Sequence, residues 1–455
     1  MSFDVRSHLK LANVVPALLL LAAVVIPALA ASASPKGFLA GQALLMLIVG
    51  FSVLLLKPQW IYAAYAFVLG AIPFALVPGA GQPMVLVLAV MVWGALLTHP
   101  IAETRTNPLE VAVALLVVTS LAAMAVTATG MDYYVEFVKW LVATSLVFAL
   151  FRLDRRDLRL FGLAYSYGVG LAAAFALAMF FLDKAGSMMN HLTFLGYGRT
   201  GTIGTHLRFY IVENTTVVRL TGTYVDPNAA GIFLFVGLAM SLSLLRGWQR
   251  FIIAGLIAAA IVSTLSRSAI FSTVVAVVVF LLFQKMSTGM RLSIIATGIV
   301  GAFGALSVRT VHDRIFRSFS STDKGSSDRA EALSNFIPSM HGNWLFGRGW
   351  GAPEFTDEIV GYQTNYVANS PLLTIYRGGI FTGLAFILVL VIGVVVAHRN
   401  MRKSPWESGV IGAAFIGFVL VALQLDFPIV THAPMTMVFS VFLVFLVANL
   451  TNRPD

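Results

Sequence analysis

The stretch LLTIYRGGIFTGLAFILVLVIGVVVA (residues 372–397) contains one formally charged residue, Arg377, and is otherwise almost entirely apolar. A helix needs about 20 apolar residues to cross a bilayer, because every backbone amide must be hydrogen-bonded within the segment. Similar runs recur along the 455 residues, of which 58% are hydrophobic and 11% are charged. We therefore predict an all-α polytopic membrane protein and exclude an ordinary soluble globule.

The apolar runs predict about 12–14 transmembrane helices. The first run, Leu11 to Ala30, lacks a cleavage pattern and is followed directly by another span, so we interpret it as the first span and not as a removed signal peptide. The expected spans are approximately 12–31, 38–56, 60–77, 83–97, 108–127, 135–151, 160–182, 229–245, 251–265, 269–283, 291–307, 372–397, 409–425 and 431–449.

Basic residues predict the orientation, because Lys and Arg in short loops stay in the cytoplasm. RLDRRDLR (152–159), RGWQR (246–250) and HRNMRKSPWE (398–407) fall on one side with both termini. The turns at 78–82, 128–134 and 426–430 fall on the other side and contain no Lys or Arg. The basic side is therefore expected to be cytoplasmic.

Five regions follow from this topology. They are N-terminal spans (1–182), a first long outer loop (183–228), central spans (229–307), a large outer loop (308–371) and C-terminal spans (372–455). Loops of this length without structure are uncommon, which suggests a function for both. In the second loop, SSDRAEALSNFIP (326–338) is typical of a short helix capped by Asp328, with Arg329 in its first turn and Pro338 at its end.

Cysteine is absent, which excludes disulfides, thiolate nucleophiles and iron–sulfur clusters. The histidines of the outer loops match no metal-ligand spacing, so we expect no metal and no cofactor. The outer-loop histidines are His191, His206, His312 and His341. The net charge of +10 sits in short loops between apolar runs, so we expect a bilayer and no nucleic acid as partner.

Two short motifs carry arginines on the predicted outer side. In VVRLTGTYVDPNAAGIF (217–233), Asp226 and Pro227 are a favourable helix start, and Arg219 lies shortly before them. In STLSRSAIF (263–271), Arg267 falls in a turn between two spans. Arginine near a bilayer indicates a functional site by default, and extension of Arg267 to the interface is an equally good explanation. For the motif at 217–233, an ordinary helix cap with an interfacial arginine and an electropositive site for a phosphorylated lipid headgroup both stay open.

A third motif, NWLFGRGWGAPEF (343–355), places Gly347, Arg348 and Gly349 in the second outer loop. Glycines let a backbone approach a ligand, and successive amides can bind an anion. The pattern follows no predicted strand, so it is neither a Walker loop nor a dinucleotide fingerprint. A flexible connection and a ligand cradle both remain open.

Together these motifs, with VANSPLLTIYRGGIFTG (367–383), give residues 215–395 a pattern that resembles the O-antigen ligase and polymerase superfamily of bacterial membrane glycosyltransferases. The family's Arg-x-x-x-Leu element corresponds to Arg329–Leu333, its Gly-x-Gly element to Gly347 and Gly349, and its Asp-Pro-Asn element to residues 226–228. The chain departs from the family where a His is usual, because Ala368 precedes Asn369 and Ser370 there.

The resemblance implies transfer of a glycan from a polyprenyl-pyrophosphate carrier to a sugar hydroxyl on a glycan or glycolipid. The reaction would serve cell-envelope polysaccharide biosynthesis at the outer face of the bacterial cytoplasmic (inner) membrane. Arg219, Arg267 and Arg329 would stabilise the pyrophosphate as catalytic residues, without a metal. The implied substrate-binding residues are Asp226, Asn228, Gly347, Arg348, Gly349, Asn369 and Ser370, and His341 or Glu331 would replace the missing base.

Two other functions stay open. One is a flippase or transporter for a lipid-linked glycan, although transporters usually show two related halves and charges near the membrane midplane. The other is a non-catalytic member of the family, which the alanine at position 368 would explain.

Overall fold

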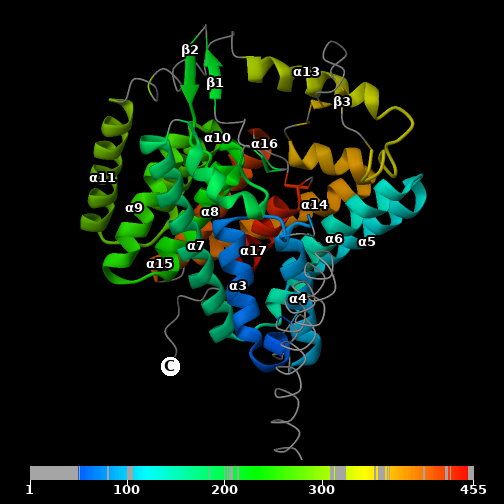
Figure 1. The fold of residues 1–455 in the computed structure, drawn as a ribbon, viewed down its shortest axis with the longest axis horizontal. Coiled ribbons are helices and arrows are strands. Elements are labelled where there is room, and N and C mark those ends of the chain that lie inside the picture. Colours follow the sequence, from blue (N-terminus) through cyan, green and yellow to red (C-terminus); the bar gives the residue numbers. More distant parts are fainter. Residues whose placement is uncertain are drawn as a thin grey trace, which may run out of the picture.

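The structure is a computed structural model (Figure 1). It describes residues 50, 52–78, 81–99, 106–183, 185–198, 200–201, 203, 209–212, 215–307, 312, 324–352, 355–356, 364–365, 367, 369–402, 405–425, 429–430 and 432–448. The expected span at 12–31 and most of the one at 38–56 lie outside these residues.

Helices make up most of the described chain, and the prediction of an all-α polytopic membrane protein is confirmed. Six helices are long and apolar enough to cross a bilayer: α5 (Pro108–Thr127), α6 (Met131–Phe151), α7 (Arg155–Leu182), α8 (Pro227–Leu244), α9 (Gly247–Thr264) and α14 (Ser370–Arg402). The shorter apolar helices are α3 (Pro58–Ala71), α4 (Met84–Thr98), α10 (Arg267–Phe283), α11 (Thr288–Leu306), α15 (Trp406–Gly417) and α17 (Ala433–Ala448).

Every expected span from 60–77 onward has a helix, with local differences in its bounds. The span expected at 60–77 ends early, at Ala71, because Pro73 cannot donate an amide to a continuing helix. The span expected at 409–425 contains a π-helical turn, η4 (Phe418–Ala422), followed by the short α16 (Leu423–Leu425).

The core of the bundle is built on α8 and α17. In α8, 83% of the residues are buried, compared with 28% in the peripheral α9. Phenylalanines of α15, η4 and α17 pack together, with Phe415 and Phe442 ring centroids 5.5 Å apart. Figure 1 shows α5 and α6 on one flank of this core and α9, α11 and α15 on the other.

The described parts of both long loops lie at the same end of the bundle (Figure 1). The first loop contributes the 3-10 helix η1 (Ser187–Leu195), the antiparallel hairpin β1 (Phe209–Val212) with β2 (Thr215–Val218), and η3 (Gly222–Tyr224). The second contributes α13 (Lys324–Ser339) and the antiparallel pair β3 (Phe355–Thr356) with β4 (Thr364–Asn365). The prediction that the second loop is partly helical is therefore confirmed.

The predicted start of that loop helix was wrong. The helix α13 begins at Lys324, so Asp328 lies inside it and is not its cap, and Arg329 lies beyond the first turn. The free amides at the helix start therefore belong to residues that precede Arg329 in the chain. The predicted end was close, because Pro338 falls in the last turn.

Candidate functional site

The guanidinium of Arg219 joins two motifs that are far apart in sequence. Its Nε donates to the carbonyl oxygen of Thr264 at 2.9 Å, and its Nη2 donates to Oδ1 of Asn228 at 2.9 Å. Asn228 is held in turn by the start of α8, because Asp226 caps that helix by accepting from the amides of Asn228 and Ala229 at 2.8 and 3.0 Å. The predicted helix start at Asp226 and Pro227 is therefore confirmed.

The turn between α9 and α10 brings Arg267 to the same corner. Leu265 adopts a left-handed conformation (φ 53°) that ends α9, and Arg267 is the first residue of α10. Ser266 and Ser268 are buried, and their hydroxyls lie 3.1 Å apart. Gly231 of α8 lets this turn pack closely, because a Cβ there would lie 3.1 Å from that of Ser266. The segments that carry Arg219, Asn228 and Arg267 thus meet at one corner, which we call the arginine corner.

The glycine-rich stretch 344–349 is hydrogen-bonded to a broken turn of α14. Gly379 interrupts this helix with φ 78° and ψ −179°, which frees the backbone groups around it. The amide of Arg348 donates to the carbonyl of Tyr376 at 2.7 Å, and that of Gly349 donates to the carbonyl of Arg377 at 3.1 Å. In the other direction, the amide of Ile380 donates to the carbonyl of Trp344 at 2.8 Å. The loop therefore replaces the helical hydrogen bonds that the break removes.

This pairing explains the two glycines that precede Trp350. Gly347 has φ 72°, and a Cβ there would lie 2.7 Å from the backbone of α14. Gly349 has φ 100°, and a Cβ there would lie 2.6 Å from the ring of Tyr133 on α6. Since the amides of residues 348 and 349 already donate to protein carbonyls, close packing is sufficient reason for both glycines. The side chain of Arg348 is exposed at this surface.

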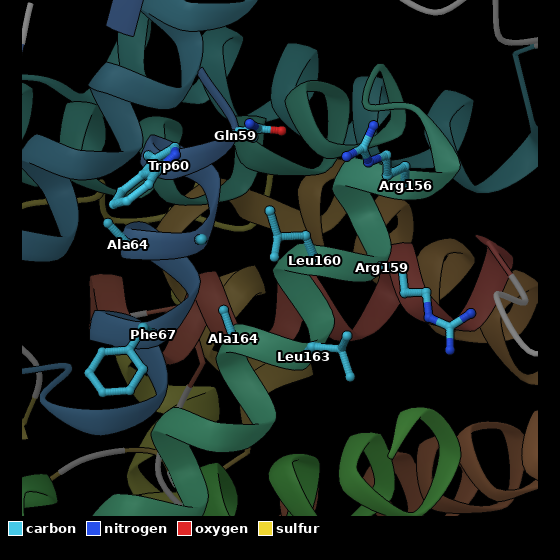
Figure 2. A pocket seen from close by; sticks show the side chains of 10 residues that line it. Gln59, Trp60, Ala64, Phe67, Arg156, Arg159, Leu160, Leu163 and Ala164 are labelled. Carbon is cyan, nitrogen blue, oxygen red and sulfur yellow. The ribbon is translucent and has the colours of Figure 1, made fainter. Parts of the chain in front are cut away.

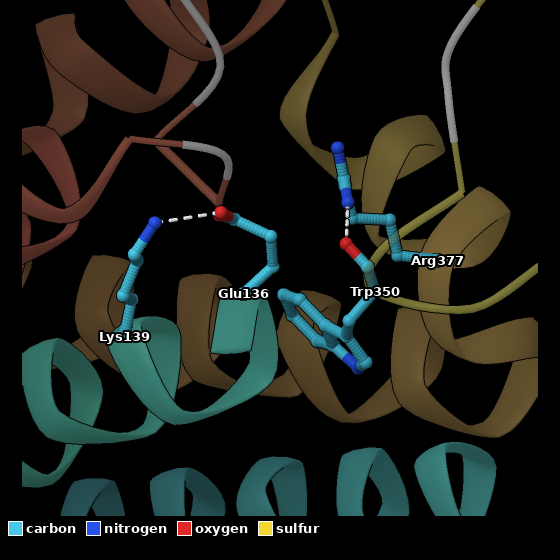
Figure 3. Close-up of polar contacts among 4 residues, drawn as sticks. All are labelled: Glu136, Lys139, Trp350 and Arg377. Carbon is cyan, nitrogen blue, oxygen red and sulfur yellow. Dashed lines mark hydrogen bonds and ion pairs between the residues drawn. The ribbon is translucent and has the colours of Figure 1, made fainter. Parts of the chain in front are cut away.

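Trp350 anchors the loop to α6 and α14. It is 1% exposed, and its ring centroid lies 4.1 Å from that of Trp140. Its carbonyl accepts a hydrogen bond from Nη1 of Arg377, which is 7% exposed. Figure 3 shows this contact beside the ion pair between Lys139 and Glu136 of α6, whose Nζ and Oε1 lie 2.7 Å apart. Charged groups from α6 and α14 therefore gather around one tryptophan of the loop.

His432 adds a titratable group to this surface. It lies in the turn before α17, and its Nε2 is shielded from solvent. Burial, with a smaller contribution from the positive charge of Arg377, lowers the pKa of His432 to about 4, while the carboxylate of Glu136 acts in the opposite direction. The imidazole is therefore neutral at pH 7.

Asn369 and Ser370 connect the start of α14 to the segment after the π-helical turn. The amide nitrogen of the Asn369 side chain donates to Oε1 of Gln424 in α16, and its Oδ1 caps α14 by accepting from the amide of Leu372 at 3.0 Å. The hydroxyl of the buried Ser370 accepts from the amide of Ile429 at 3.3 Å. Both predicted substrate-binding residues thus have structural partners.

The remaining predicted residues are placed less fully. Arg329 and Glu331 lie on the backbone of α13, but their side chains lie outside the described part of the structure, as does Ala368. His341 is exposed in the turn after α13. Among the described residues, no group of three or more His, Asp or Glu side chains could hold a metal ion together.

Comparison with known families decides the relationship. Residues 251–387 match the family model described as O-antigen ligase. This part of the chain is similar to the O-antigen ligase family. No curated protein matches the sequence. The resemblance inferred from the motifs is therefore confirmed over the part of the chain that carries Arg267, Arg329 and the glycine-rich stretch.

The O-antigen ligase match begins in α9 and ends in α14, so it leaves out several residues of the site. Arg219 and Asn228 precede it, and Gln424 and His432 follow it. Arg377, the single charge in the apolar run at 372–397, was assigned no role from the sequence, although a charge in such a run is a signal for a functional site. Gln424 and His432 had no such signal, because only the folded bundle brings Gln424 to the start of α14 and His432 near Arg377 and Glu136.

Proposed function

We propose that this O-antigen ligase family protein transfers a glycan from a polyprenyl-pyrophosphate carrier to a sugar hydroxyl on a glycan or glycolipid acceptor. The observation that carries the proposal is the arginine corner, where Arg219 is fixed between Asn228 and the backbone of the turn before Arg267. A diphosphate is a doubly charged leaving group, and guanidinium groups bind phosphate oxygens in a bidentate manner.

In the proposed reaction, the acceptor oxygen attacks the anomeric carbon of the donor sugar while the bond from that carbon to the carrier pyrophosphate breaks. The hydroxyl proton passes to a base, and the electron pair of the broken bond stays on the pyrophosphate. Arg219, Arg267 and Arg329 stabilise that developing charge. The loop around Arg348, with Asn369 and Ser370, would shape the donor pocket.

The proton acceptor is the least constrained part of the proposal. His341 and Glu331 are the bases suggested by sequence. His432 is a third candidate, because it is neutral at pH 7 and lies close enough to Arg377 and Glu136 for their charges to affect its pKa. Replacing each of the three with Gln and comparing the pH dependence of turnover would identify the base. Only loss of the base removes the acidic limb of the profile, where protonation of the base lowers turnover.

Reconstitution in proteoliposomes tests the transfer itself. With a polyprenyl-pyrophosphate oligosaccharide and a glycolipid acceptor, we expect glycosylated acceptor and free carrier pyrophosphate without nucleotides and in the presence of EDTA. Arg267→Gln should lower turnover about 100-fold or more, as loss of a charge-stabilising donor does. Arg291→Gln is the matched control, because this exposed arginine lies at the start of α11, one helix length from the corner. Equal turnover in both variants would remove Arg267 from the site, and lipid movement without transfer would indicate a flippase.

A further inference from the structure

A groove separates α3 from α7 at the end of the bundle away from the long loops. Its volume is about 730 Å³, and Trp60 and Phe67 line it on α3, with Leu160 and Leu163 on α7. Figure 2 shows the lining side chains on α3 and α7, with Arg156 and Arg159 projecting from α7. The groove lies along the start of α3. The other end of α3 leads to Leu76, whose amide donates to the carbonyl of Leu195 in the first long loop. The groove is therefore at the opposite end of α3 from the long loops and the arginine corner.

Two glycines explain why the groove exists. A Cβ on Gly70 would lie 2.7 Å from the carbonyl oxygen of Tyr165, and one on Gly168 would lie 2.6 Å from that of Phe67, so the helices touch at this crossing. The lining residues extend from the starts of both helices to this crossing, with Trp60 and Arg156 at one end and Phe67 and Ala164 at the other (Figure 2). The helices therefore run in parallel and diverge toward their starts. The apolar wall from residue 59 to 67 is about 12 Å long at 1.5 Å per residue.

The groove has the charge pattern of a lipid site. Arg156 is exposed and Arg159 is half-buried, and neither forms an ion pair within the described residues. Arg152, just before them, does pair with Glu110. The acidic neighbours are Asp154, which caps α7 by accepting from the amide of Asp157 at 2.6 Å, and Asp157 itself. Trp60, 66% exposed at the mouth, is the residue type found where a membrane meets water.

We propose that this groove binds one anionic phospholipid of the leaflet on the basic side of the protein, with an acyl chain against α3 and α7 and its phosphate on Arg156 and Arg159. Basic pockets between transmembrane helices suit such head groups, because the chain fills apolar surface while the phosphate meets the cations. A zwitterionic lipid offers the same chains without the net charge. The site does not depend on the proposed transfer reaction.

Native mass spectrometry of the full-length protein tests the proposal, with dioleoyl phosphatidylglycerol and dioleoyl phosphatidylcholine as probes. Arg156→Gln with Arg159→Gln should weaken the tightest phosphatidylglycerol site on the order of 30-fold, from about 1 kcal/mol for each cation. Phosphatidylcholine should bind this site weakly in every variant. The matched control, Arg399→Gln with Arg402→Gln, removes two exposed arginines from the last turn of α14 and should leave the affinity unchanged.

A second variant separates the chain-binding wall from the phosphate contact. Ala64→Trp fills the groove while both arginines remain, so it should also displace the lipid. Retention of phosphatidylglycerol in this variant and in the double arginine variant would overturn the proposal, as would equal binding of phosphatidylcholine. Complete disulfide formation between Ala64→Cys and a cysteine introduced at 12–31 would also overturn it, because a segment of the chain would then fill the groove. The natural chain has no cysteine to confuse that result.

Discussion

Replacing Gly379 with Ala should damage the junction between α14 and the glycine-rich loop. Gly379 has φ 78° and ψ −179°, a region of backbone space that is essentially restricted to glycine. An added Cβ would also overlap the carbonyl oxygen of Leu345. The methyl group therefore opposes both the break in the helix and the close approach of the loop.

The expected magnitude has two parts. The unfavourable backbone conformation costs about 1–3 kcal/mol. Moving the loop away from the methyl group would stretch the 2.8 Å hydrogen bond from the Ile380 amide to Trp344, which contributes about 1 kcal/mol. We expect the free energy of unfolding to fall by about 2–4 kcal/mol.

Equilibrium unfolding in mixed micelles, followed by tryptophan fluorescence, measures this change. Gly255→Ala is the matched control, because Gly255 lies within α9 and nothing would lie within 4 Å of its added Cβ. That variant should be unchanged or more stable by up to about 1 kcal/mol. If Gly379→Ala unfolds within about 0.5 kcal/mol of the natural protein, the hydrogen-bonded junction does not hold the loop and our reasoning fails.

Three further predictions concern the site. Arg377→Met should lower the free energy of unfolding by about 2 kcal/mol in the same assay, because the Trp350 carbonyl loses a charged donor; no change would mean that water replaces it. The pKa of His432 is about 4 in the folded protein and near 6.5 in the unfolded chain, so only the unfolded chain takes up a proton between these pH values. The contribution of this histidine to stability is therefore complete above pH 6.5 and is lost as the pH falls toward 4. His432→Gln should therefore flatten the dependence of Tm on pH over that window, and an unaltered slope would assign it to other groups. Arg348→Gln should lower turnover while Tm stays constant, since this side chain is exposed; a matching fall in Tm would make its role structural.

Helix positions were predictable because hydrophobicity is a local property. Each apolar run of about 20 residues must form a helix in a bilayer, so the spans follow from composition alone. The Asp226 cap was predictable for the same reason, since its hydrogen bonds reach only two and three residues along the chain. The start of α13 was predicted wrongly because a capping pattern does not exclude an earlier helix start.

The site was less predictable because its contacts join distant segments. The sequence shows Arg219 and Arg267 as separate motifs, but not the Thr264 carbonyl that links them. It left open whether the glycine-rich stretch was a cradle or a connection, and the structure assigns its amides to the broken turn of α14. That pairing depends on Gly379, some thirty residues away, which no local pattern could indicate.

The π-helical turn at 418–422 has a consequence for chain length. A π turn contains one more residue than the α-helical path it replaces, so the sequence after it is displaced by one position relative to a continuous α-helix. A one-residue deletion in the regular part of α15 would rotate α16 by about 100° and draw it back by about 1.5 Å, which would turn Gln424 away from Asn369. Deleting Val419 would instead close the π turn to an α turn and leave Gln424 facing Asn369. A deletion should therefore be tolerated better within residues 418–422 than elsewhere in this helix.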